Sequence, residues 1–306
     1  HTRVSLMSGF KSDLTRVRGI QMMIASATLV STSGLIFRNF SDIEIFEVVF
    51  FRSFALSVVM VFLMGFIYGR DWFQTVKNIG LWGVIGAAFF AGAQTSYVFA
   101  FSHTTIANIT FTIAVAPFIT ALLARLLLAE TIGKHTMAAM FLAAIGISIL
   151  VYSNVRLDSI YGSVFALTTA CCFSCFAVIL RRNRHIEMLP VLLVTGLITM
   201  PIGWLGGSWQ HNISAHDIAL CFVWGGILQG VGQSLLIRST KVLKAAEVPL
   251  IMLLEFTLGP VWVWIFMDEL ISRSTFIGGA IILTAVLGLA VFELAHKHDK
   301  TTTTSR

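Results

Sequence analysis

The chain has 306 residues, of which 57% are hydrophobic and only 12% are charged, and its formal net charge is +6. Soluble domains normally carry about 25% charged residues, so this composition argues against a soluble enzyme or nucleic-acid-binding domain. The mean hydropathy of +0.86 and recurring apolar runs of about 20 residues, each long enough to cross a bilayer as a helix, predict a membrane protein surrounded by lipid.

Ten transmembrane helices are predicted, and the polar segments between them are short. The first apolar run follows basic residues but is too long for the core of a signal peptide, so we expect it to be retained as a helix. In chain order the predicted spans are 19–37, 45–67, 79–102, 104–128, 135–152, 159–180, 188–207, 217–238, 241–267 and 275–293.

Lysine and arginine positions predict the orientation of these spans. If the N-terminus is inside, only Arg38, Arg156 and Arg273 lie outside, while Arg52 and Arg125 fall within spans and all other basic residues lie inside. Such a bias is typical of cytoplasmic loops and tails. We therefore expect both termini to be cytoplasmic, and the positive net charge needs no nucleic-acid partner.

The two halves of the chain align with each other. A shift of 139 residues places Gln94 on Gln233 and Glu130 on Glu269. Five spans per half is an odd number, so the halves face opposite ways, which is the architecture of alternating-access transporters. The same comparison aligns Gly86 with Gly225, Thr95 with Ser234 and Ala107 with Ala246, and a shift of 143 aligns Gly19 with Gly162 and Arg38 with Arg181.

The predicted fold class is an all-α membrane protein with ten transmembrane helices in two inverted five-helix repeats. Residues 1–18 are a cytoplasmic tail, 19–152 the first repeat and 153–293 the second. Residues 294–306 are a second cytoplasmic tail that ends in a remnant of cloning. Two full repeats in one chain make a monomer sufficient for function.

The residues of the repeat also carry a family resemblance. The segment from Ala107-Asn108 through Pro117 to Ala129-Glu130, and that from Ala246 through Leu254-Glu255 to Glu269, resemble the fourth and ninth helices of EamA-type drug/metabolite transporters. The usual Glu-Pro of the ninth helix is missing, because Phe256 follows Glu255. Among these transporters the chain is most similar to bacterial aromatic amino acid exporters. The resemblance implies export of small metabolites across the bacterial inner membrane.

Several polar and aromatic side chains are expected to bind substrate. Gln94 and Gln233 occupy equivalent mid-membrane positions, and Gln229 lies four residues before Gln233 on the same helical face. Amides offer donors and acceptors for a zwitterion, but they also join helices by hydrogen bonds, and both interpretations stay open. Tyr97, Trp224 and Asn108 complete the predicted substrate site.

Two charged residues within spans are candidates for coupling. Glu255 is the carboxylate nearest the middle of a span, and such groups often mark proton or substrate pathways. It either couples to protons or binds an ammonium group, or it forms a structural ion pair, for which Arg52 is one partner. Arg52 itself either extends to the membrane surface or attracts a carboxylate.

Pro117 and Pro260 are predicted hinges, because proline frees a backbone carbonyl within a helix. Two short small-residue series, Gly83-Ala87-Ala91 and Gly226-Gly230, predict close helix packing. The four cysteines lie in apolar segments without a ligand set for zinc, so we expect no metal and no cofactor.

A secondary transporter of amino acids, aromatic or otherwise neutral, is the leading hypothesis. Sugar phosphates or nucleotide sugars would need clustered basic groups, for which Lys241 and Lys244 at the entrance of a span remain candidates. Drug efflux coupled to protons through Glu255 is a third possibility. An intramembrane enzyme or a channel is the alternative of a different class, but the sequence has no HExxH, GxSxG or nucleotide-binding motif and no intramembrane aspartate pair.

Overall fold

A computed structural model describes residues 16–41, 43–104, 109, 112–151, 160–209, 213–267 and 273–302. All regular structure in these residues is helical. Four further apolar helical stretches are Ala116–Leu128, Lys134–Ile149, Val191–Gly206 and Phe276–Leu289, of which the second and fourth are parts of longer helices. Six are long and apolar enough to cross a membrane: Arg16–Phe37, Ile45–Lys77, Gly80–His103, Ile160–Arg182, Ala215–Ser239 and Glu247–Phe266. The all-α membrane class is confirmed, whereas the count of ten spans and their inverted repeat stay predictions.

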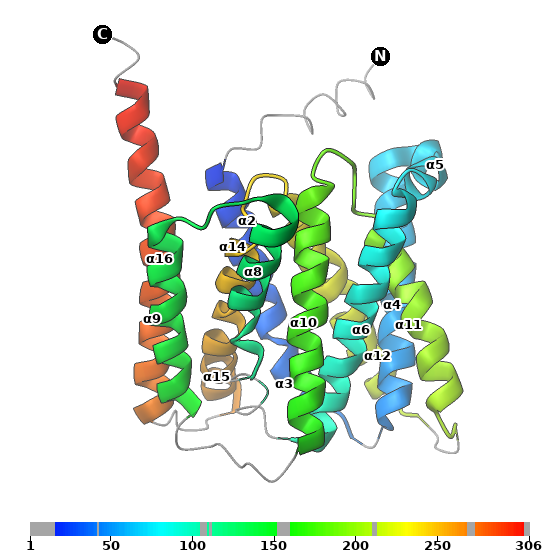
Figure 1. The fold of residues 1–306 in the computed structure, drawn as a ribbon. Coiled ribbons are helices and arrows are strands. Elements are labelled where there is room, and N and C mark those ends of the chain that lie inside the picture. The colour runs from blue at the N-terminus through cyan, green and yellow to red at the C-terminus, as the bar shows by residue number, and fades with distance from the viewer. Residues whose placement is uncertain are drawn as a thin grey trace.

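The helices form one bundle, with most axes running in the same direction or its reverse (Figure 1). Helices α9 and α16 pair at one edge, whereas α4, α6 and α11 pack together near the other. The helices are α2 (Arg16–Ser31), α3 (Ser33–Arg38), α4 (Ile45–Tyr68), η1 (Gly69–Asp71), α5 (Trp72–Lys77), α6 (Gly80–His103), α8 (Ala116–Leu128), α9 (Lys134–Val151), α10 (Ile160–Arg182), α11 (Val191–Gly206), α12 (Ala215–Phe222), η2 (Val223–Val231), α13 (Gly232–Ser239), α14 (Glu247–Met252), α15 (Leu254–Met267) and α16 (Arg273–Thr302).

Two predicted spans differ from the structure in the described residues: one begins later than the hydropathy suggests, and the other is interrupted by a turn. Helix α14 begins at Glu247 rather than at 241, because the Glu247 carboxylate accepts the backbone N–H of Lys244 at 3.0 Å and thereby satisfies a donor ahead of the helix. Helix α8 begins at Ala116 with Pro117 in its first turn, a position where proline needs no backbone donor. Residues 112 and 113 are also helical, and a turn at residues 114 and 115 separates them from α8. Pro117 thus follows an interruption of the predicted span, and its hinge role stays a prediction.

Glycines bring helix α4 close to its neighbours. A Cβ at Gly225 would overlap the backbone carbonyl of Arg52, and one at Gly203 would lie 2.5 Å from the backbone nitrogen of Phe50. Gly226 and Gly230 both lie against Val59, at 2.7 and 3.2 Å from an added Cβ, so their predicted packing role is confirmed. Helices in a membrane associate through such close contacts, because lipid provides no hydrophobic drive between them.

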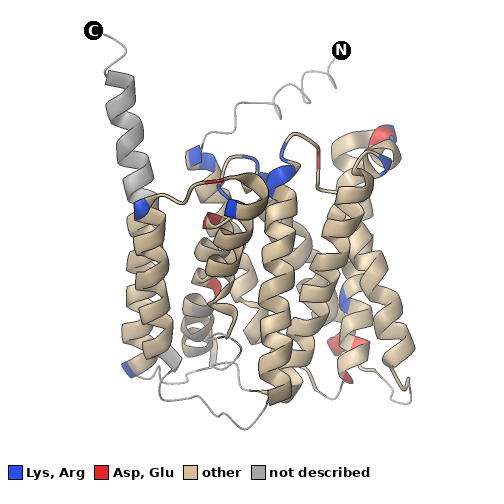
Figure 2. Cartoon of the chain, viewed as in Figure 1, with Lys and Arg blue, Asp and Glu red and all other residues tan. Residues whose placement is uncertain are grey.

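Charged residues gather at the end of the bundle where α2 and α14 begin, which we call the basic end (Figure 2). Arg181 Nε donates to Glu130 Oε1 at 2.7 Å, and Lys241 Nζ donates to Glu187 Oε2 at 2.9 Å. Arg16 pairs with Glu247 at the start of α14. The lysine and arginine positions predict that this end is cytoplasmic, and the orientation of the bundle in the membrane stays a prediction.

Candidate functional site

The main candidate site is a cavity inside the bundle with an empty volume of about 680 Å³, open space included. Its walls come from both halves of the chain. It is lined by Val30, Ser33, Phe90, Ala93, Gln94, Tyr97, Ile113, Ala116, Thr169, Phe173, Trp224, Gln229, Gln233, Pro249, Met252, Leu253 and Glu255. Six residues that the sequence analysis singled out therefore share one cavity, although 161 positions separate Gln94 from Glu255 in the sequence.

The cavity walls are mostly apolar, and their polar groups are few. Gln229 Nε2 donates to Gln94 Oε1 at 2.6 Å, so this pair joins α6 to η2. The side-chain oxygen of Gln233 and the hydroxyl of Ser33 are buried without a partner among the described residues. Buried polar atoms without partners are costly, so these two are available to a bound molecule.

The π-helix η2 (Val223–Val231) positions Trp224 and Gln229. The sequence analysis expected an uninterrupted α-helix over 217–238 and missed this segment. A π-turn widens the helix and is often found at functional sites. The one sequence signal for it is the density of glycine at Gly225, Gly226 and Gly230, which lets η2 approach α4 closely.

Glu255 and Tyr97 form a second polar pair in the cavity. The Tyr97 hydroxyl donates to Glu255 Oε1 at 3.2 Å. Glu255 lies in the first turn of α15, directly after the interruption at Leu253 that separates α14 from α15. The backbone remains helical through position 260, so the described break lies at Leu253, and the hinge role of Pro260 stays a prediction.

Arg52 lies behind the cavity wall and does not line it. The residue is only 1% exposed. It therefore does not extend to the protein surface, which was one of the two interpretations of the sequence. Its Nη2 donates to the backbone oxygen of Gln94 at 3.3 Å. Its guanidinium carbon lies 4.8 Å from the ring centroid of Trp224. Among the described side chains no ion pair includes Arg52, so it is not bridged to Glu255.

Of the remaining predicted site residues, the structure describes only the side chain of Pro117. Asn108 is outside the described residues, as is Glu269 of the repeat, and the side chain of Pro260 is not described. Pro117 is buried but does not line the cavity. The sequence analysis missed several lining residues, among them Phe90, Thr169, Phe173, Pro249 and Met252, because apolar residues occur on every face of these helices and do not distinguish a cavity wall.

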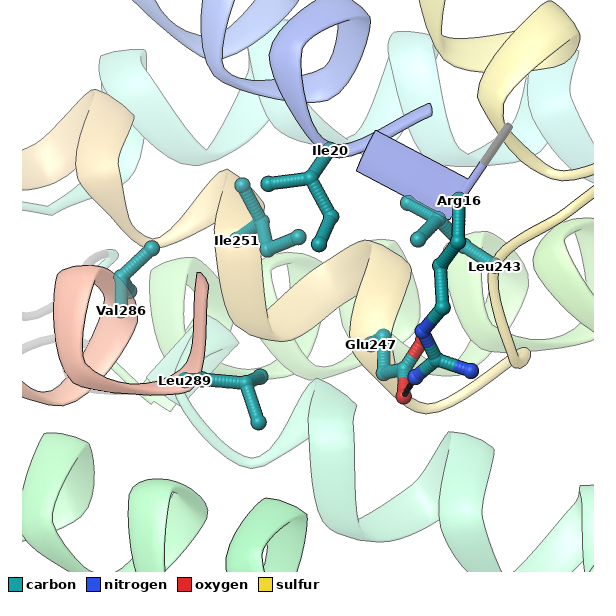
Figure 3. A pocket seen from close by; sticks show the side chains of 7 residues that line it. All are labelled: Arg16, Ile20, Leu243, Glu247, Ile251, Val286 and Leu289. Carbon is teal, nitrogen blue, oxygen red and sulfur yellow. Dashed lines mark hydrogen bonds and ion pairs between the residues drawn. The ribbon is translucent and has the colours of Figure 1, made fainter. Parts of the chain in front are cut away.

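A second, smaller cavity of about 220 Å³ lies at the basic end between α2, α14 and α16 (Figure 3). Arg16 and Glu247 pair at one side of it, and Val286 and Leu289 of α16 border the opposite side. Ile20, Leu243 and Ile251 complete the lining. Apart from the ion pair this cavity is apolar, and the space is much smaller than that of the central cavity.

Comparisons with known proteins agree with the fold. The sequence model of the EamA-like transporter family matches residues 17–152. A solved structure titled "Crystal structure of protein" is similar with a TM-score of 0.78 and 15% identity, over 91% of this chain and 99% of that one. No curated protein gives a significant match. Residues 17–152 thus carry an EamA-like transporter domain, and the chain is a multi-pass membrane protein.

Proposed function

We propose that the chain is a secondary transporter that exports small neutral amino acids, aromatic or otherwise, by alternating access through the central cavity. The proposal includes ten spans in two inverted repeats, both termini cytoplasmic, in a bacterial inner membrane. Inverted repeats around a central site are the usual basis of alternating access.

The observation that carries this proposal is the composition of the cavity. It combines apolar and aromatic walls with two glutamine side chains that bond to each other, a third glutamine, and one carboxylate. Amides, a hydroxyl and a carboxylate match an amino acid's charged groups, while Phe90, Phe173 and Trp224 suit an apolar or aromatic side chain. The EamA-like domain supports transport of small molecules as the general activity.

Sugar phosphates fit this cavity less well. Among the described residues no lysine or arginine lines it, and multiple basic groups are the usual phosphate ligands. Lys241 Nζ binds Glu187, and Lys244 Nζ donates to the backbone oxygen of Thr131 at 2.9 Å. Both lysines are thus engaged at the basic end. Proton-coupled drug efflux through Glu255 remains the second candidate, since this carboxylate lines the cavity.

Counterflow in proteoliposomes tests the proposal. Vesicles loaded with unlabelled phenylalanine should accumulate labelled phenylalanine, and vesicles loaded with a sugar phosphate should not accumulate the labelled sugar phosphate. Gln94→Ala should abolish or strongly reduce the amino acid signal, because it removes a cavity amide and leaves Gln229 without its partner. Arg125→Gln, at an exposed position of α8, is the control and should transport normally. Counterflow of sugar phosphate alone would refute the substrate class.

A further inference from the structure

We propose that Arg52 makes the central cavity select substrates that carry a carboxylate, and that it does so from behind the wall formed by Gln94 and Trp224. This inference rests on the proposed function, because it concerns how the same cavity chooses among amino-acid-like molecules.

The first observation is a buried positive charge without a counter-charge. Arginine stays protonated in proteins, and Arg52 is almost fully buried. Its Nε and Nη1 have no hydrogen-bond acceptor among the described residues. A buried ion that lacks a partner costs several kcal/mol, so an anion that enters the neighbouring space would be stabilised by this charge.

The nearby carboxylates of the described residues are engaged elsewhere. Glu47, on the same helix as Arg52, accepts the backbone N–H of Glu44 through Oε2 at 3.1 Å, and its Oε1 is buried without a hydrogen-bond partner among the described residues. Asp217 accepts the backbone N–H of Ser41 at 3.0 Å. Glu255 is bound by Tyr97 at 3.2 Å. None of these three forms an ion pair with Arg52, so its charge remains available.

The second observation is where this charge lies. Arg52 contacts two residues that line the cavity, through the backbone oxygen of Gln94 and the ring of Trp224. Its backbone is pressed against Gly225, the residue after Trp224, so the guanidinium and the indole are held together. Charges interact strongly over several ångströms where water is scarce. A substrate carboxylate beside Gln94 or Trp224 is therefore attracted without touching Arg52.

The third observation is the opposite charge on the same cavity. Tyr97 is three residues after Gln94 on α6 and holds Glu255. The cavity thus has a carboxylate on the Tyr97 side and a fixed positive charge behind Gln94. These two opposite charges are complementary to a zwitterion whose ammonium faces Glu255 and whose carboxylate faces Gln94. In this arrangement the charge of Arg52 determines how strongly binding depends on the carboxylate of the substrate.

Binding of two matched ligands tests this role. Phenylalanine and phenylalanine amide share the ring and the amino group, and only the former carries a carboxylate. For purified full-length protein, the ratio of the two dissociation constants should favour phenylalanine. Arg52→Gln and Arg52→Met should each reduce this preference by about 10-fold to 100-fold, the range expected for an interaction with a charged group. Arg52→Lys, which keeps the charge, should retain most of it.

The controls separate the possible outcomes. Arg125→Gln removes a positive charge from an exposed position and should leave the ratio unchanged, and thermal unfolding in detergent checks that each variant is folded. If the wild type binds neither ligand, the proposed function fails. If the wild type binds phenylalanine and both neutral Arg52 variants keep the wild-type ratio of dissociation constants, the role of Arg52 is wrong while the proposed function stands. If replacing chloride by gluconate in the buffer changes the ratio of dissociation constants, Arg52 binds an inorganic anion, and the proposal is overturned.

Discussion

At the residue scale, the hydrogen-bonded side chains of Gln229 and Gln94 have two roles, helix packing and substrate contact, which a single substitution cannot separate. It joins η2 to α6 at 2.6 Å, and both side chains line the cavity. Hydrogen bonds between membrane helices contribute on average about 0.6 kcal/mol and at most about 2 kcal/mol. The packing role is thus modest, and a large effect on transport would have to come from substrate contact.

A double-mutant cycle over Gln94→Ala and Gln229→Ala separates these roles. We expect a coupling free energy of unfolding of about 0.5–1.5 kcal/mol, measured by denaturation in mixed micelles, because the two amides bond directly. In both single variants the free energy of phenylalanine binding should weaken by more than this coupling free energy. If both single variants are folded and bind phenylalanine as the wild type does, these glutamines only join the helices.

The sequence could identify Gln94 and Gln233 because the internal repeat places the same residue at equivalent positions. It could identify Glu255 because a carboxylate in the middle of an apolar run is costly. It could not show that Gln94 bonds to Gln229 rather than to Gln233, nor that Arg52 lies over Trp224. Both contacts depend on the distance between helices, which the sequence does not specify.

At the element scale, η2 shows how tertiary packing changes a helix. The apolar sequence of 217–238 is compatible with a regular α-helix, and helical periodicity is uninformative where every face is apolar. The close approach of Gly225 to the backbone of Arg52 brings the segment against α4. The π-helical segment carries Trp224 and Gln229 into the cavity wall.

Gly225→Ala tests this dependence. Its methyl group would overlap the carbonyl oxygen of Arg52, a backbone atom that cannot move alone. We expect a loss of about 1–3 kcal/mol in the free energy of unfolding, as for other overpacked sites, together with weaker phenylalanine binding. Gly65→Ala in α4, where an added Cβ meets nothing within 4 Å, should be neutral or stabilising by up to about 1 kcal/mol. Equal stability of the two variants would contradict this account.

At the scale of the whole molecule, the central cavity lies between residues from both halves, and the basic end is joined by contacts across the same division. Glu130 of the first half binds Arg181 of the second at 2.7 Å and also accepts the backbone N–H of Ala245 at 3.3 Å. Arg181 in turn donates to the backbone oxygens of Thr240 and Lys241. Helix α14 then leads from this network to Pro249 and Met252 in the cavity wall.

The internal repeat gives this network a wider meaning. Arg181 aligns with Arg38 and Glu130 with Glu269, so an inverted repeat, if present, would place the same two residue types at the opposite face of the membrane. Glu269 and the side chain of Arg38 lie outside the described residues, and the test therefore concerns the pair that is described. In alternating access this pair must open whenever the cavity opens toward the basic end.

Glu130→Gln should consequently favour the state that is open at the basic end. The measurement is labelling of Met252→Cys, in a background without the four native cysteines, by a membrane-impermeant thiol reagent applied from the basic side. The side chains of Arg181 and Glu130 are 10% and 21% exposed, so we expect a shift of about 1 kcal/mol, or about fivefold faster labelling. Glu187→Gln breaks an ion pair of the same end that lies entirely within the second half and should leave labelling unchanged. Equal labelling in both variants would mean that the Glu130–Arg181 pair has no part in closing that end.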